Sequence, residues 1–222
     1  MAEKPIIFST EMVRAILEGR KTMTRRVVKP QPSHDVFVPD EGFIHCTEDG
    51  TICGQYLVLN PPDDACAEVA EFPVKSRYKP GDVLWVREAW CKNENPNSPN
   101  YGGYEYYADY EGAHCQSLIK WRSPIHMPRK AARIFLKVKN IQVERLQDIT
   151  EEDAEAEGAI DWICQQHNNG TWIDNAMRGA ACAKPKRAFA LLWNSIHEKR
   201  GFGWDQNPWV WVIEFEKVEP EI

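Results

Sequence analysis

The chain has 222 residues, 43% of them hydrophobic, and a net charge of -6 at pH 7. This length suits one large domain or a small domain with long insertions, and we expect the second arrangement. The negative charge weighs against non-specific attraction to a polyanion, although it is compatible with a local basic patch.

The sequence has no run of about eighteen apolar residues, and its N-terminus lacks the apolar core of a signal peptide. We therefore expect a cytoplasmic protein without a membrane span. The seven cysteines are odd in number and include no Cys-x-x-Cys pair, which indicates reduced thiols. Because the cysteine and histidine spacings do not match a zinc site, we expect neither a metal nor another cofactor.

The first predicted helix ends near Gly19. Its apolar positions have the i, i+3, i+4 spacing of an amphipathic helix: Val13, Ile16 and Leu17. Ser9 or Thr10 is the expected N-cap, and Gly19 is able to take the left-handed conformation that ends a helix.

A strand is predicted over residues 22–28, directly after this helix. Alternation would place Thr22, Thr24 and Arg26 on one face and Lys21, Met23 and Arg25 on the other. The long side chain of Lys21 is still able to reach the hydroxyl of Thr24, where a desolvated, neutral lysine would act as a base. The alternative is a solvated basic strand, because five of the ten residues from 20 to 29 are Lys or Arg.

The middle of the chain is predicted to alternate loops and strands. We expect an insertion over 29–76, a turn over 79–82, strands over 83–90, 104–110 and 134–143, and a loop over 93–103.

Thr150 and Asp153 form a capping box that predicts a helix closed by Gly158. Glu157 then lies at the C-terminal end of this helix, where the negative end of the macrodipole favours a nearby cation. Lys21 would provide this cation, provided that burial outweighs the glutamate and still lets the lysine lose its proton.

The last predicted elements are a helix that ends at Gly201 and a strand over 209–218. The apolar face of the helix consists of Phe189, Leu192, Trp193 and Ile196. The elements together predict an α+β fold with a small mixed barrel.

Four blocks of the chain resemble the ASCH family and occur in the same order as in that family. The blocks are 16–24, which contains a Gly-Arg-Lys-Thr-x-Thr motif, 79–84, 149–158 and 212–215. The ASCH family is PUA-like. The resemblance implies a single domain over 1–222, built on a PUA-like mixed β-barrel with flanking helices. The segments between the blocks are then insertions, over 31–76, 92–130 and 161–185.

Within this family the chain most resembles small bacterial amidohydrolases that remove the acyl group from N4-acetylcytidine. Their catalytic lysine, threonine and glutamate correspond to Lys21, Thr24 and Glu157. The glutamate is chosen from an acid-rich stretch over 150–157 that offers several candidates. The resemblance implies a modified nucleoside as substrate.

A nucleobase needs flat contacts and its reaction needs an oxyanion donor. Trp85 and Arg87 share a strand face, Arg20 is a possible oxyanion donor, and His126 lies between two prolines in a loop that would form a rigid rim. We therefore expect the substrate to be bound by Arg20, Trp85, Arg87 and His126, with the histidine structural rather than catalytic.

Two other function classes stay open. PUA-like barrels commonly bind RNA, so an RNA-binding module or a ribonuclease is the second hypothesis, with the basic residues of 20–29 contacting phosphates. Larger ASCH relatives occur in phage and prophage genomes, so a non-catalytic phage accessory protein is the third. No sequence pattern indicates the oligomeric state.

Overall fold

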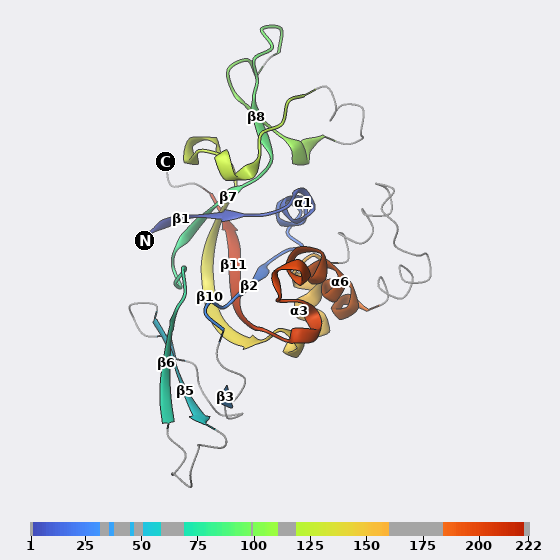
Figure 1. The fold of residues 1–222 in the computed structure, drawn as a ribbon. Helices are drawn as coiled ribbons and strands as arrows, with labels where there is room; N and C mark the ends of the chain where they lie inside the picture. The colour runs from blue at the N-terminus through green and yellow to red at the C-terminus, as the bar shows by residue number, and fades with distance from the viewer. Residues whose placement is uncertain are drawn as a thin grey trace.

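The computed structural model describes residues 2–31, 36–37, 45–46, 51–58, 69–98, 100–110, 119–159 and 184–219. Its centre is a five-stranded sheet with the order β1-β7-β10-β11-β2 (Figure 1). The strands are β1 (Glu3–Ile7), β7 (Val83–Arg87), β10 (Phe135–Arg145), β11 (Trp209–Val218) and β2 (Met23–Val27). The β1–β7 pair is parallel and the other three pairs are antiparallel.

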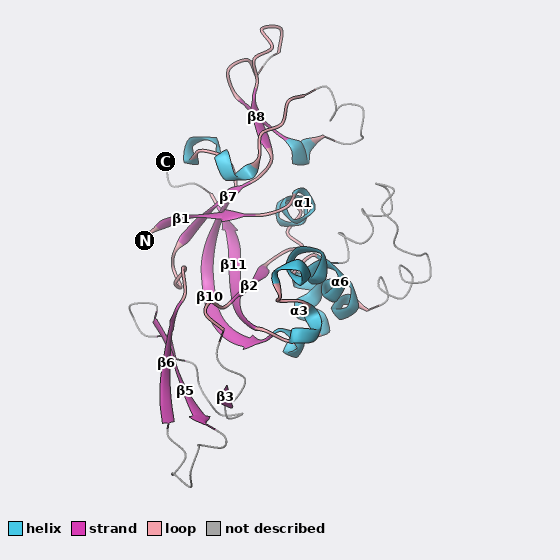
Figure 2. Ribbon diagram, in the orientation of Figure 1, coloured by secondary structure: helices cyan, strands magenta, loops and turns pink. Residues whose placement is uncertain are grey.

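Smaller sheets extend from this centre. One consists of β3 (Val36–Phe37), β4 (His45–Cys46), β5 (Thr51–Val58) and β6 (Val69–Lys75), and the other of β8 (Trp90–Lys92) and β9 (Tyr104–Tyr106). Figure 2 shows β5 and β6 on one side of the central sheet and β8 on the opposite side. The long segment expected as an insertion over 31–76 therefore contains paired strands of its own.

Three helices of the described residues lie beside the sheet: α1 (Thr10–Leu17), α3 (Glu151–Ala156) and α6 (Pro185–His197). The caps of the first two are as predicted, because the Ser9 hydroxyl accepts from the Met12 amide at 3.5 Å and the Thr150 hydroxyl accepts from the Asp153 amide at 3.1 Å. The mixed α+β class is thereby confirmed. None of the helices in the described ranges is long and apolar enough to cross a membrane.

Short 3-10 turns connect these elements, over Tyr107–Asp109, Pro124–His126, Arg129–Ala131, Leu146–Asp148, Glu198–Arg200 and Trp204–Gln206. The strand predicted over 104–110 is therefore wrong in its second half, which forms a turn. The strand predicted over 83–90 also breaks, between β7 and β8. At this break the Glu88 amide donates to the Met127 sulfur at 3.3 Å, and the Glu88 carboxylate binds Arg133.

The main core lies between the sheet and the helices. It combines residues from all of them, including Val13 and Ile16 of α1, Ala154 of α3, Phe189 and Trp193 of α6, and Leu84, Leu136 and Ile213 of the sheet. A second, smaller cluster of Trp90, Met127 and Ala131 lies under the β8–β9 hairpin. Burial of these apolar side chains is the main source of stability and holds the ends of α1 and α3 against β2.

Candidate functional site

Lys21 lies between α1 and β2, and its side chain has no solvent exposure. Its ammonium donates three hydrogen bonds, to the Met23 carbonyl at 2.8 Å, the Glu157 carbonyl at 2.8 Å and the Glu157 Oε2 at 2.7 Å. Burial lowers the pKa of Lys21, the nearby Glu157 opposes this effect, and Arg26 and Arg25 add to it. The environment therefore brings the ammonium closer to losing a proton than in water.

The ends of α1 and α3 meet at Lys21. The Lys21 amide donates to the Ala15 carbonyl at 3.1 Å, and the Thr22 amide donates to the Ala156 carbonyl at 3.0 Å. Gly158 ends α3 with a φ of 73°, and a Cβ at this residue would lie 3.2 Å from the Ala15 Cβ. A glycine is thus needed here for both its backbone conformation and its lack of a side chain.

Arg25 is the second buried cation, and its guanidinium has no solvent exposure. It contacts three carboxylates, Glu144 at 2.7 Å, Asp153 at 2.9 Å and Glu157 at 3.4 Å. Its Cζ also lies 5.8 Å from the ring centre of Phe189 in α6. Since Lys21 binds one oxygen of Glu157 and Arg25 the other, two cations fix the orientation of this carboxylate.

Thr24 and Arg26 occupy the opposite face of β2. Thr24 is 1% exposed, and its hydroxyl oxygen accepts a hydrogen bond from the Arg26 Nη1 at 2.8 Å. Arg26 also donates to the carbonyls of Arg25 and Ile7, both at 3.1 Å. The Arg26 guanidinium therefore links the Thr24 hydroxyl of β2 to the Ile7 carbonyl of β1. These two strands are the outer ones in the sheet order.

The Phe8 ring is close to both the lysine and this arginine. The Lys21 Nζ is 5.6 Å and the Arg26 Cζ is 5.3 Å from the centre of the Phe8 ring. Thr24 is not among the three acceptors of the Lys21 ammonium in the described structure. The predicted lysine and glutamate are thus in direct contact, whereas the threonine joins their cluster through Arg26 and Phe8.

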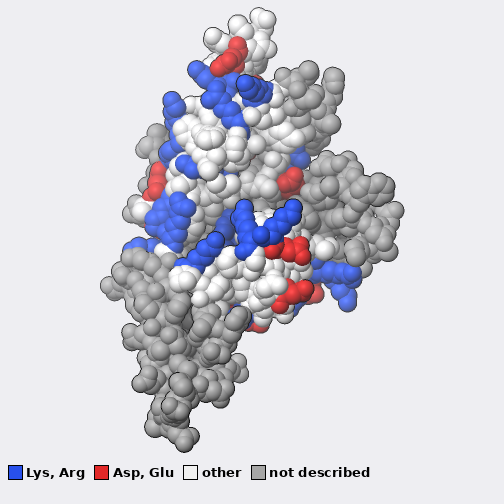
Figure 3. All heavy atoms as spheres, viewed as in Figure 1, with Lys and Arg blue, Asp and Glu red and all other residues white. Residues whose placement is uncertain are grey.

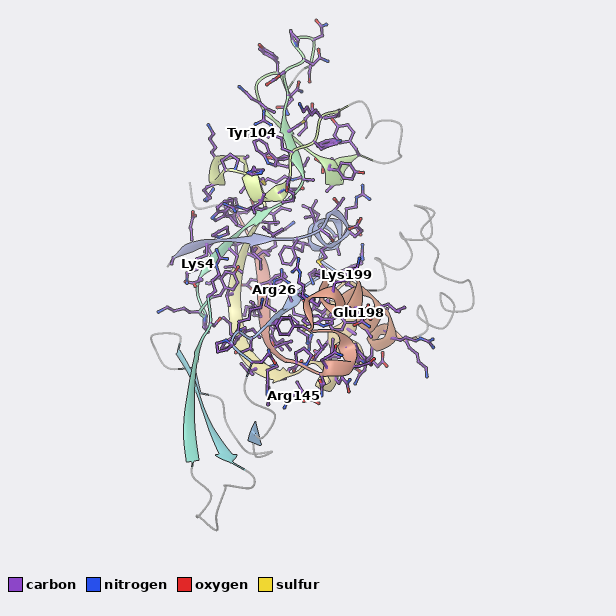
Figure 4. All side chains as sticks on the ribbon, viewed as in Figure 1. Lys4, Arg26, Tyr104, Arg145, Glu198 and Lys199 are labelled. Atoms are coloured by element: carbon purple, nitrogen blue, oxygen red, sulfur yellow. The ribbon has the colours of Figure 1, made fainter. Side chains whose placement is uncertain are left out.

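A pocket of about 550 Å³ lies beside this cluster, between β1 and β2. Figure 4 labels Arg26 near the middle of this region, between β1 and the helices. The lining residues are Pro5, Ile6, Ile7, Arg26, Val27, Lys29, Ser76, Arg77, Tyr78, Arg87, Trp211 and Ile213. Ile213 pairs with Thr24 across β11 and β2, so the pocket adjoins the predicted site, although Lys21, Thr24 and Glu157 are not among its described lining residues.

The four predicted substrate-binding residues differ in their burial and in their position relative to the pocket. Arg87 lines the pocket and stacks on Trp85, with its Cζ 4.6 Å from the ring centre, while Trp85 itself is 7% exposed and does not line it. Arg20 is exposed and pairs with Glu18. His126 is exposed at the end of a 3-10 turn and lies outside the pocket lining.

Sequence reasoning gave Arg26 and Phe8 no role in the amidohydrolase site, and it treated Arg25 only as a positive charge near Lys21. The signal for Arg26 was its position two residues after Thr24, which places both on one strand face. Nothing local indicated the role of Arg25, because its three carboxylates come from β10 and α3.

His197 of α6 also lies in this electrostatic environment and was not noticed in the sequence. Burial, and then the nearby cations Arg26, Arg200 and Lys29, lower the pKa of His197 to about 4. Its ring centre is 4.2 Å from that of Trp193. The side chain is therefore neutral near neutral pH.

Comparisons of the chain with protein-family models, with curated proteins and with solved structures found no match.

Proposed function

We propose that this chain is a cytoplasmic amidohydrolase of the ASCH type, which removes the acyl group from N4-acylated cytosine nucleosides. Thr24 is the nucleophile, Lys21 the base, and Glu157 orients Lys21. The observation that carries the proposal is the buried Lys21–Glu157 pair at the start of β2, together with the buried Thr24 hydroxyl of the same strand, which already accepts a hydrogen bond from a guanidinium.

The arrangement of the sheet supports the expected PUA-like barrel. β1 and β2 stand at the two ends of the strand order, yet both line the same pocket. The Arg26 guanidinium on β2 also donates to a β1 carbonyl, that of Ile7. The outer strands are thus close together, as they are when a sheet curls toward closure.

In the first step, the neutral amine of Lys21 turns from its Met23 and Glu157 acceptors toward Thr24 and takes the hydroxyl proton, while the Thr24 oxygen attacks the carbonyl carbon of the exocyclic amide. The amide C–N bond then breaks, and the leaving nitrogen takes this proton from the Lys21 ammonium to become the cytosine amine. Water hydrolyses the resulting acyl-threonine ester, which releases the acyl group as a carboxylic acid and restores the Thr24 hydroxyl. The lowered pKa of Lys21 favours the neutral amine that this sequence of steps requires.

Arg26 is better suited than Arg20 to assist the nucleophile. Its Nη1 already donates to the Thr24 oxygen, and a charged donor stabilises the negative charge that develops when the proton leaves. The Arg20 side chain instead pairs with Glu18 at the surface.

The pocket has a suitable size and lining for a nucleoside. Its volume of about 550 Å³ lies within the range of about 300–1,000 Å³ that is typical of small-molecule sites. Tyr78 and Trp211 contribute aromatic walls, which suit a flat base.

The test is the ultraviolet spectral change of N4-acetylcytidine on incubation with the purified protein. We expect the wild type to form cytidine, Thr24→Ala to lose about 1,000-fold or more of kcat, and Lys21→Met to lose about 100- to 10,000-fold. The exposed Thr22 is the matched control, and Thr22→Ala should keep wild-type turnover. Cytidine formation by folded Thr24→Ala at the wild-type rate, or none by the folded wild type, would refute the proposal.

A further inference from the structure

Four cationic side chains line the pocket between β1 and β2: Arg26, Lys29, Arg77 and Arg87. None of the twelve described lining residues is Asp or Glu. In the part of the chain that the structure describes, none of the four forms a salt bridge, whereas other cations such as Lys4, Arg25 and Arg133 do. The cations of this pocket therefore have no ion-pair partner among the described residues, although the chain as a whole is acidic.

The four cations are held by neutral groups. Arg87 stacks on Trp85, the Arg77 Cζ lies 5.7 Å from the Tyr78 ring centre, and the Lys29 Nζ lies 5.1 Å from the Phe202 ring centre. Stacking of this kind fixes the direction of a cation and leaves its hydrogen-bond donors available.

Arg87 carries a specific indication of a missing partner. Its Nε is buried and has no hydrogen-bond partner in the described structure. Buried donors are almost always paired, and an unpaired one is unfavourable. The Nε belongs to the guanidinium of a residue that lines the pocket, so an anion bound in the pocket would lie next to this charged group and stabilise it.

We propose that this pocket binds the phosphate of a cytosine nucleotide, so that the preferred substrate is an N4-acylated nucleotide rather than a neutral nucleoside. Phosphate oxygens match the forked donors of guanidinium groups and neutralise their charge. Arg26 connects the two halves of the ligand, because it lines the pocket and also donates to Thr24. The identity of the base and its acyl group rests on the proposed function, whereas phosphate binding is measured without any turnover.

A mononucleotide fits these observations better than a nucleic-acid strand. The unpaired cations converge on one hollow, whereas a strand requires a basic track that follows several phosphates. Figure 3 shows Asp and Glu side chains close to the basic ones on this face. Together with the net charge of -6, they would repel an extended polyanion.

The experiment is calorimetric titration of the full chain with cytidine 5′-monophosphate and with cytidine at low salt. We expect the nucleotide to bind at least about tenfold more tightly than the nucleoside. In Arg87→Gln and in Arg77→Gln this preference should fall by about tenfold or more. The matched control is Arg122→Gln, since Arg122 is an exposed arginine stacked on Trp90 outside the pocket, and this variant should keep the wild-type preference.

Equal affinities for the two ligands, or an unchanged preference in both pocket variants, would overturn the inference. Oligocytidylate that binds far more tightly than the mononucleotide, with a steep salt dependence, would also overturn it in favour of nucleic-acid binding. The preference is a ratio within one protein sample, so partial unfolding of a variant does not imitate its loss.

The two proposals fail in different ways. Nucleotide binding that depends on Arg87, without hydrolysis of any N4-acylated cytosine, would support the phosphate site and refute the amidohydrolase. Hydrolysis with equal kcat/KM for N4-acetylcytidine and its 5′-monophosphate would support the amidohydrolase and refute the phosphate site.

Discussion

Arg25 is expected to contribute more to folding stability than any exposed cation of the chain. The substitution Arg25→Met keeps most of the side-chain volume and removes a charge that contacts Glu144, Asp153 and Glu157. Removing one partner of a buried ion pair typically lowers the free energy of unfolding by about 3–5 kcal/mol, because the remaining charge is left without compensation.

The structure argues for the lower end of this range. The side chains of Glu144 and Asp153 are 19% and 28% exposed, so water is able to solvate them once the arginine is gone. Glu157 is only 3% exposed, but it keeps the Lys21 ammonium at 2.7 Å. We therefore expect a loss of about 3 kcal/mol.

The measurement is urea denaturation at neutral pH, followed by tryptophan fluorescence, with an unchanged slope as the sign that only stability has changed. Arg129→Met is the control, because its pair with Glu3 has side chains that are 40% and 50% exposed and is worth about 1 kcal/mol or less. If Arg25→Met loses no more free energy of unfolding than this control, the buried network does not stabilise the fold and the reasoning is wrong. Since Arg25 also lowers the pKa of Lys21, the pH profile of turnover should move to higher pH in Arg25→Met.

Three further predictions concern the surroundings of the site. Gly158→Ala should lower the free energy of unfolding by about 2 kcal/mol or more, and Gly19→Ala by about 1 kcal/mol. Both glycines have a positive φ, but of these two only Gly158 has a neighbour, the Ala15 Cβ, that an added Cβ would meet. Equal urea midpoints for the two variants would contradict this prediction. Thr150→Ala removes the cap of α3 and should cost about 1 kcal/mol in thermal unfolding, and an unchanged midpoint would show that the cap is not needed. The pKa of His197 is about 4 in the folded chain and about 6.5 when unfolded, so its stabilisation is complete above about pH 6.5 and is lost as the pH falls toward 4. After allowance for solvent screening, the stability lost by protonation of His197 amounts to about 1–2 kcal/mol. Between pH 6.5 and 4 the urea midpoint should therefore fall less steeply in His197→Gln than in the wild type. Parallel curves for the two proteins would contradict the prediction.

Local signals predicted the helices better than the strand ends. Ser9 and Thr150 act within one helical turn, so their capping roles are visible in the sequence, and both are confirmed. β1 was not predicted. It contains Pro5, which disfavours a central strand, and it forms at the edge of the described sheet, paired with β7. The break at Glu88 depends on Met127, far along the chain, and no local pattern indicates it.

The same distinction applies to the two neighbouring arginines of β2. Alternation along a strand correctly separates Arg25 from Thr24 and Arg26, because it follows from backbone geometry alone. Whether each charge is then neutralised depends on what faces it, and the nearest carboxylate of Arg25 in the chain is Glu144, which lies 119 residues away. Arg25 is therefore enclosed by carboxylates and stabilises the fold, while Arg26 donates to neutral acceptors among the described residues and keeps its charge beside the pocket. A run of basic residues that looks uniform in the sequence thus contains one cation committed to the fold and one whose charge remains available at the site, and only the tertiary structure separates them.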